Sequence, residues 1–392
     1  MGKYKLINNV LGWIVFAIAS TVYLMTMEPT ASFWDCGEFI SSAYKLEVGH
    51  PPGAPFFMLT ANLFTQLASD PSTVAKMVNT MSALFSGLTI LFLFWSITHL
   101  ARKIMVKDGE EASLGQMITV MGSGLVGALA YTFSDTFWFS AVEGEVYAYS
   151  SLFTAVVFWL ILKWEAVADK PHADRWIVLI AYLMGLSIGV HLLNLLCIPA
   201  IVLVYYYKKF PNPTMKGTLV ALLASFAIVA LMMYGVVQGL VEVCGYFELL
   251  FVNVLGMPYN SGVFAYVIIV AGVLIWSIWE TMRDEIHPTR MKIAFILSVV
   301  LIGIPFIGSG YVLAVILTAA LSLYLFKSKK VDIKTLNTIL VCLMVVVVGY
   351  SSYALTLIRA TADTPMNQNA PSDIFTLRTY LAREQYGNCL LY

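Results

Sequence analysis

Long apolar runs recur along almost the whole chain, and they decide what kind of fold it can adopt. A helix needs about 20 mostly apolar residues to cross the hydrocarbon of a bilayer. Hydrophobic residues make up 59% of the 392 positions and charged residues only 12%, which is far from the composition of a soluble domain of this length. We therefore predict an all-α, polytopic membrane protein with about 11 transmembrane helices. The spans are expected near residues 10–27, 74–100, 116–133, 149–164, 176–191, 193–207, 217–240, 263–280, 292–308, 309–326 and 335–358.

The distribution of Lys and Arg predicts the topology. The run 53–69 is apolar enough to be a further span, but counting it as a crossing would place most cations of the later loops outside, against the positive-inside rule. With this run along the outer interface, the N-terminus is inside. The run 10–27 follows a basic start and is long for a cleaved signal peptide, so we interpret it as an uncleaved anchor. All but five of the 23 Lys and Arg residues then lie inside, the exceptions being Lys45, Lys76, Arg359, Arg378 and Arg383.

The first outer loop, residues 28–73, contains the strongest candidate site. Its stretch WDCGEFISSAYKLEVGHPPGAPFF is rich in polar and ionisable groups. If residues 33–46 form an interfacial helix, Asp35 and Glu38 share one face because they are three positions apart. Prolines disfavour a helix, so the sequence His50-Pro51-Pro52-Gly53 is expected to end it and to hold His50 near the carboxylates. The alternative is that both acids are solvated loop residues and the prolines a connector.

Further candidates follow in the second outer loop and beyond. Glu143, Glu145 and Tyr147 lie beside an aromatic group, although the positive end of the next helix is a structural reason for the two acids. His191 and Asn194 are three apart at the outer end of a span, where an ionisable group suggests function and a hydrogen bond between helices is the alternative. Arg359 follows the last span and suits a lipid phosphate or a helix-end anchor.

Several function classes are disfavoured by what the sequence lacks. It contains no G-x-x-x-x-G-K-[ST], G-x-S-x-G or H-E-x-x-H, which argues against an ATP-driven pump, a serine hydrolase and a zinc protease. The five cysteines show no CxxC spacing and no clustering with histidines, so neither a structural zinc site nor a disulfide framework is predicted. Net charge is zero, and no long basic run suggests nucleic acid as a partner.

A membrane helix followed by an acidic outer loop and many short-looped spans resembles the layout of GT-C glycosyltransferases. Four strings, WDCGEFISSAYKLEVGHPPGAPFF, VEGEVYAYSSLF, GLSIGVHLLNLLCIPA and TLRTYLAREQYGNCLLY, are similar to a large family of bacterial multi-spanning proteins of unknown function. That family also includes an animal transmembrane protein O-mannosyltransferase. The resemblance covers nearly the whole chain and implies a GT-C-like transmembrane domain over residues 1–358.

The resemblance also implies an activity. The enzyme would move a sugar from a polyprenyl-phosphate carrier to Ser or Thr of an exported protein. The family resemblance implies that this sugar is mannose. Asp35 matches the acidic residue that GT-C enzymes use as a base, and a positioned carboxylate can take the proton of a poorly nucleophilic alcohol. Glu38 and His50 would assist it, Glu143, Glu145, Tyr147, His191 and Asn194 would bind substrate, and Arg359 would bind the carrier phosphate.

The sequence also leads to expectations about cofactors, partners, membrane location and alternative functions. We expect no cofactor and no metal, although Asp35, Glu38 and His50 could hold a divalent cation without matching a specific site. We expect a bacterial inner-membrane protein with a periplasmic active face, membrane lipid as a partner, and an outer tail over 359–392 that can also be read as the start of a soluble domain. A transporter or flippase for a lipid-linked saccharide and a scaffold for envelope proteins are the alternative functions.

Overall fold

The computed structural model describes residues 2–107, 109–308, 311–328 and 331–387. Over these ranges the chain is helical and forms no β-strand, with one isolated backbone bridge between Val48 and Asn367. It divides into two compact units. Unit 1 comprises Met1–Glu47, Ala54–Trp176 and Ser187–Pro211, and unit 2 comprises Val48–Gly53, Ile177–Leu186 and Asn212–Tyr392. The prediction of an all-α membrane protein is therefore confirmed at the level of its architecture.

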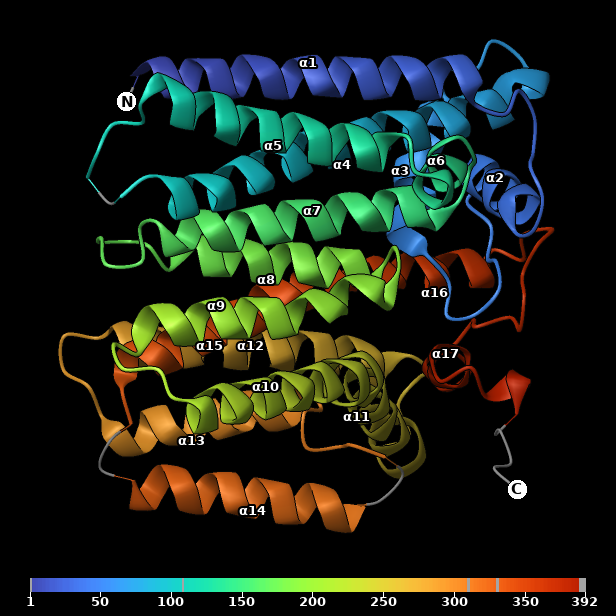
Figure 1. The fold of residues 1–392 in the computed structure, drawn as a ribbon. Coiled ribbons are helices and arrows are strands. Elements are labelled where there is room, and N and C mark those ends of the chain that lie inside the picture. The colour runs from blue at the N-terminus through green and yellow to red at the C-terminus, as the bar shows by residue number, and fades with distance from the viewer. Residues whose placement is uncertain (1, 108, 309–310, 329–330, 388–392) are drawn as a thin grey trace, which may run out of the picture. The chain divides into compact units, whose positions relative to one another are not determined.

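Four long helices form the frame of unit 1 and lie side by side (Figure 1). The central one is α4 (Val74–Met105), which packs against α1 (Gly2–Thr26), α5 (Leu114–Thr132) and α7 (Val146–Glu165). With 32 residues, α4 is about 48 Å long at 1.5 Å per residue, so it extends beyond the hydrocarbon of a bilayer. An ion pair between Lys103 and Glu165 joins the C-terminal ends of α4 and α7.

Short helices gather at the opposite end of α4 and α7. α2 (Cys36–Lys45) and α3 (Pro55–Thr65) pack on each other, and Asn62 Nδ2 of α3 donates hydrogen bonds to the carbonyls of Ala43 and Tyr44 at 2.9 and 3.1 Å. At 11 residues, α3 is about 16 Å long, a length suited to the interfacial position predicted for 53–69. The remaining elements of this unit are η1 (Pro71–Thr73), α6 (Asp135–Ala141), η2 (Leu192–Cys197) and α9 (Ile198–Lys209).

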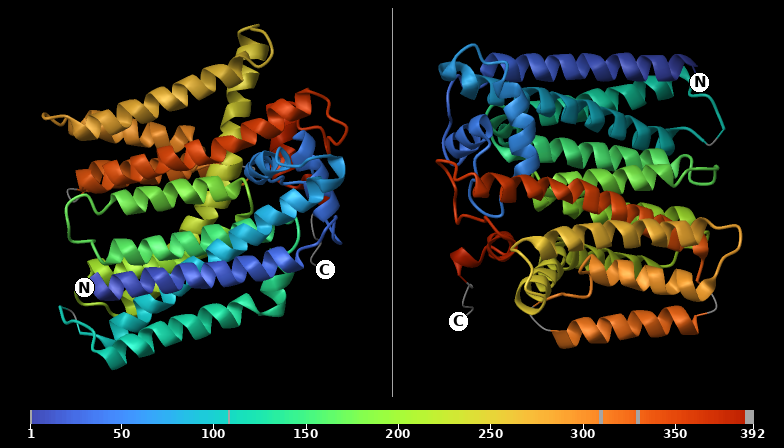
Figure 2. Two further views of the ribbon diagram at one scale, coloured as in Figure 1. Left: turned by 90° about the horizontal axis from the view of Figure 1, so that it is seen from above. Right: turned by 180° about the vertical axis from the view of Figure 1, so that it is seen from behind.

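Unit 2 is built around α12 (Ser261–Met282), which packs against α13 (Pro288–Leu301), α15 (Ile333–Tyr350) and α11 (Gly239–Leu249). Figure 2 shows α11 running across the direction of α12. Most of α8 (Arg175–Ile188) belongs to this unit, and α14 (Tyr311–Lys327) packs on α13. The other elements are α10 (Met215–Ala230), η3 (Leu231–Gln238), η4 (Leu250–Val254), η5 (Ser351–Tyr353), α16 (Ala354–Thr361), α17 (Ile374–Leu381) and η6 (Glu384–Tyr386).

The span predicted at 217–240 is too short. Helical structure continues from Met215 to Val254, with π-helical turns at 231–238 and 250–254. Two acids, Glu242 and Glu248, lie inside this stretch beyond the predicted end at residue 240. Glu248 accepts hydrogen bonds from the backbone N–H groups of Asn260 and Val263 at 2.6 and 3.1 Å, and Glu242 accepts one from Tyr246. Because both carboxylates have donors, the helix tolerates them.

Eight helical stretches are long and apolar enough to cross a membrane within the described residues. The eleven predicted spans all fall on helices, but three of them coincide with shorter ones, at 175–188, 288–301 and 311–327, so the count of eleven is not confirmed. Residues 309 and 310, where one predicted span begins, lie outside the described residues, as does Cys389. The eight stretches are Gly2–Thr26, Pro71–Met105, Leu114–Thr132, Val146–Glu165, Leu192–Lys209, Met215–Val254, Ser261–Met282 and Ile333–Thr361.

Candidate functional site

Asp35 stands at the start of the predicted interfacial helix. It is the N-terminal cap of α2, and its carbonyl accepts the Phe39 N–H at 2.9 Å, but its side chain makes no capping hydrogen bond. The carboxylate is exposed and is therefore available to a substrate. The helix ends at Lys45 because Leu46 adopts a left-handed conformation. The expectation that His50-Pro51 ends it was wrong, since the chain turns five residues earlier.

Glu38 lies one turn along the same helix, as its spacing predicts. A carboxylate oxygen of Asp35 and one of Glu38 lie within 4.8 Å of each other. Two such groups can supply part of the oxygen shell of a divalent cation, which takes six or more ligands, and the expectation of no metal stays a prediction. Phe33 and Trp34, directly before Asp35, are strongly exposed, Trp34 at 86%, so an apolar surface adjoins the carboxylates.

Two acids of the second outer loop, Glu143 and Glu145, are buried in unit 1. Glu145 is only 5% exposed, caps α7 and accepts the Val146 N–H at 3.2 Å, which is the structural role that its place before a helix suggested. Glu143 is 3% exposed. Burial raises the pKa of Glu143, and the neighbouring Glu28 adds to this effect. Its Oε2 has no hydrogen-bond partner in the described part of the chain.

Cys36 of the first outer loop lies next to the acids of the second outer loop. It was not predicted as a site residue. Its side chain is fully buried. Burial raises the pKa of the Cys36 thiol, and the carboxylates of Glu143, Glu145 and Asp35 raise it further. The thiol is therefore neutral, and carboxylates from residues about 110 positions apart in the chain are gathered around it. Only the adjacency of Cys36 to Asp35 could have suggested this.

Residues of α4 hold in place the loops that contain this carboxylate group, by which we mean the cluster of Asp35, Glu143 and Glu145. Asn79 Nδ2 donates hydrogen bonds to the carbonyls of Glu28 and Thr30 at 2.7 and 3.0 Å, and the Glu28 N–H donates to the Val142 carbonyl at 3.0 Å. A Cβ atom at Gly144 would lie 2.9 Å from Ile40 and 3.0 Å from Asn79 Oδ1. Glycine between the two glutamates therefore lets the second loop lie against both α2 and α4.

The remaining candidates of unit 1 divide into two kinds. Tyr147 is exposed, and its ring centroid lies 5.4 Å from that of His191, so these two can face a substrate together. Asn194 is fully buried; it donates to Ser187 Oγ at 2.9 Å and accepts from Thr154 Oγ1 at 3.3 Å. This supports the alternative of a hydrogen bond between segments. Both predicted residues lie in the connection between α8 and α9, because α8 ends at Ile188.

His50 and Arg359 belong to unit 2. The segment 48–53 is held there by the C-terminal region: Val48 N–H donates to the Met366 carbonyl at 3.0 Å, and the Tyr380 hydroxyl donates to the Gly49 carbonyl at 2.6 Å. Arg359 lies in the last turn of α16 and is half-buried. The proximity of His50 to Asp35 and the role of Arg359 at a phosphate both stay predictions.

Comparison with known proteins finds relatives of this region. Residues 35–214 match the family model described as the protein O-mannosyl-transferase TMEM260 N-terminal domain. Two curated relatives are protein O-mannosyl-transferase TMEM260 of Mus musculus, 28% identical over 174 residues (44% of this chain), and its namesake in Dictyostelium discoideum, 25% identical over 187 residues (46%). The chain covers about a fifth of either relative, 22% and 21%. No solved structure matches.

Proposed function

We propose that this membrane protein is a glycosyltransferase, because residues 35–214 match the protein O-mannosyl-transferase TMEM260 N-terminal domain and two curated relatives carry the same name. It moves mannose from a polyprenyl-phosphate carrier to a Ser or Thr hydroxyl of an exported protein. The main supporting observation is the cluster of carboxylates around Cys36 in unit 1, in which Asp35 is exposed and Glu143 and Glu145 are buried. The GT-C fold, the mannose and the carrier belong to this proposal.

Asp35 acts as the general base. The acceptor oxygen attacks the anomeric carbon of the sugar while its proton passes to the Asp35 carboxylate. The bond between that carbon and the carrier phosphate breaks, and the phosphate leaves with the electron pair. An exposed carboxylate without a capping hydrogen bond suits this role because its lone pairs are available to the acceptor.

The other residues position the reactants. Glu38 lies beside Asp35. Tyr147 follows Glu145 by two positions, and its ring centroid lies 5.4 Å from that of His191. They would orient sugar or acceptor hydroxyls. His50 would assist the base, and Arg359 would pair with the phosphate of the carrier, since a guanidinium matches it with two hydrogen bonds. Asn194 would act indirectly, by holding the connection that contains His191.

The test is transfer of radiolabelled mannose from polyprenyl-phosphate mannose to a Ser/Thr peptide by the purified chain. We expect Asp35→Asn to reduce transfer by about 10² or more, the contribution of a positioned general base. Asp135→Asn is the matched control, because Asp135 is also exposed and lies in the second outer loop. Equal transfer by the wild type and Asp35→Asn would exclude the base role. Absence of transfer by the wild type would contradict the proposed donor or acceptor.

A further inference from the structure

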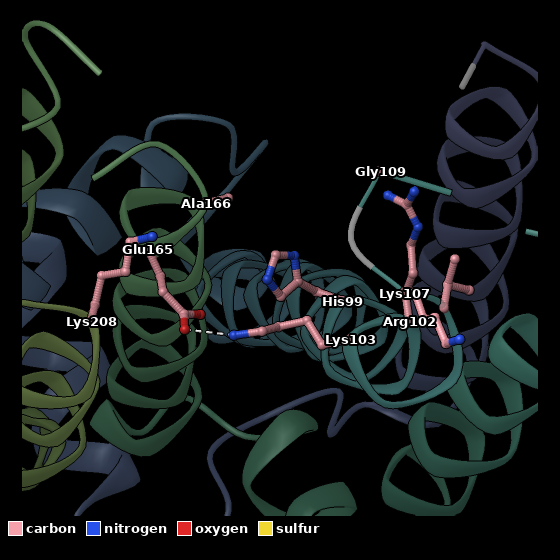
Figure 3. A pocket seen from close by; sticks show the side chains of 9 residues that line it. His99, Arg102, Lys103, Lys107, Gly109, Glu165, Ala166 and Lys208 are labelled. Atoms are coloured by element: carbon pink, nitrogen blue, oxygen red, sulfur yellow. Dashed lines mark hydrogen bonds and ion pairs between the residues drawn. The ribbon is translucent and has the colours of Figure 1, made fainter. Parts of the chain in front are cut away.

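A second site lies at the other end of the same helices. A cavity of about 440 Å³ is formed where α4, α7 and α9 end, and it lies wholly within unit 1 (Figure 3). α7 has 20 residues and is about 30 Å long, so it separates this cavity from the carboxylate group at its N-terminus. The lining residues are His99, Arg102, Lys103, Val106, Lys107, Gly109, Glu165, Ala166 and Lys208.

The lining is strongly basic. Four of its side chains are cationic and one, Glu165, is a carboxylate. Glu110 and Glu111, which follow Gly109, are exposed and are not among the described lining residues. The cavity volume falls in the range of about 300–1,000 Å³ typical of small-molecule sites. A concave site of this size with an excess of positive charge favours an anion.

Two of the cations are already neutralised. Figure 3 shows the Lys103 side chain reaching Glu165, with its Nζ 2.5 Å from the carboxylate oxygen. Lys208 Nζ lies 2.7 Å from an Asp169 oxygen. These pairs hold one side of the cavity in place. The remaining positive charge belongs to the other two cationic side chains, Arg102 and Lys107.

Arg102 and Lys107 supply that charge. Neither forms an ion pair within the described residues. The Arg102 guanidinium lies over the Tyr4 ring, 4.8 Å from its centroid, a contact that fixes its position without neutralising it. Its Nε is buried and has no hydrogen-bond partner in the described parts of the chain. A buried donor without a partner carries a desolvation cost, which a bound acceptor would remove.

We propose that this cavity binds a phosphate group, with Arg102 and Lys107 as its ligands. Arginine matches phosphate oxygens with paired hydrogen bonds, and lysine adds a point charge. The group is either the headgroup phosphate of an anionic lipid or a free phosphate compound. Basic pockets between transmembrane helices typically bind anionic headgroups. The site is independent of sugar transfer, so its test does not depend on the proposed function.

The experiment uses the whole chain purified in neutral detergent. Phosphatidylglycerol, phosphatidylcholine or sodium phosphate is added; retained lipid is counted by native mass spectrometry and phosphate binding by thermal shift. The test variant is Arg102→Gln/Lys107→Gln. Lys170→Gln/Lys216→Gln removes the same charge from two exposed positions outside the cavity. The single variant Lys107→Gln alters an exposed side chain and keeps the test valid if the double variant does not fold.

We expect the double variant to bind about a hundredfold more weakly, since each charge-assisted hydrogen bond contributes about tenfold, and Lys107→Gln about tenfold. The control should stay within about twofold by the same scale. Retention of phosphatidylglycerol over phosphatidylcholine would identify a lipid source, and a response to sodium phosphate alone a soluble one. Equal binding by the cavity variants and the control, for lipid and for phosphate, would overturn the proposal.

Discussion

Glu143 is the most deeply buried of the acidic side chains predicted for the site. Its raised pKa, above the ordinary value of 4.5, means that the folded protein keeps this proton to a higher pH than the unfolded chain does. Between 4.5 and the raised value the folded state binds more protons, so the free energy of unfolding falls as pH rises. Each unit of pKa difference corresponds to about 1.4 kcal/mol.

We therefore expect Glu143→Gln to reduce the decrease in thermal stability between acidic and neutral pH, because the amide does not ionise. The measurement is the Tm of both proteins in detergent across that range. Glu110→Gln, at an exposed loop position, is the control and should keep the wild-type dependence. An unchanged dependence in Glu143→Gln would mean that Glu143 ionises in the folded state as it does in water.

At the scale of elements, two helices of unit 2 approach each other through glycine. A Cβ atom at Gly185 in α8 would lie 2.5 Å from the Val346 carbonyl oxygen of α15, and one at Gly349 would lie 2.5 Å from the Leu186 nitrogen. Backbone atoms cannot rotate away as a side chain can. Small residues at helix contacts allow this close packing in membranes, so these glycines determine how α8 and α15 meet.

Gly185→Val should separate the two helices and cost about 1–3 kcal/mol, as overpacking typically does. Stability against thermal or detergent-induced unfolding is the measurement. Gly272→Val in α12 is the matched control, since a Cβ atom there meets no atom within 4 Å, and it should change stability by about 0.5 kcal/mol or less. Equal effects of the two substitutions would show that the contact between α8 and α15 contributes nothing specific.

At the scale of the whole molecule, the topology depends on whether α3 crosses the bilayer. Its packing on α2 and its 11 residues favour an interfacial position, which keeps the loops before and after it on one side. The positive-inside rule then places the ends of α4 and α7 on the other side. The carboxylate group and the basic cavity would thus face opposite sides of the membrane.

Single cysteines in a background without the five native ones test this arrangement. Ala31→Cys and Ser72→Cys, both at exposed positions, should react with a membrane-impermeant maleimide added to the outer side of the intact membrane. Lys170→Cys, also exposed, should react only after the membrane is opened. Labelling of Ser72→Cys solely in opened cells would mean that α3 crosses the membrane and that the later loops are inverted.

The sequence by itself determined the class of fold, the positions of the apolar helices and the two loops that contain the candidate acids. Run length, charge bias and the spacing of Asp35 and Glu38 are local properties, so they can be read without the fold. Only the tertiary structure decided that Cys36 lies among the carboxylates, that Asn194 is satisfied by Ser187 and Thr154, and that Arg102 and Lys107 line a cavity. These facts depend on contacts between residues far apart in the chain, and hydropathy and spacing contain no information about which distant side chains meet.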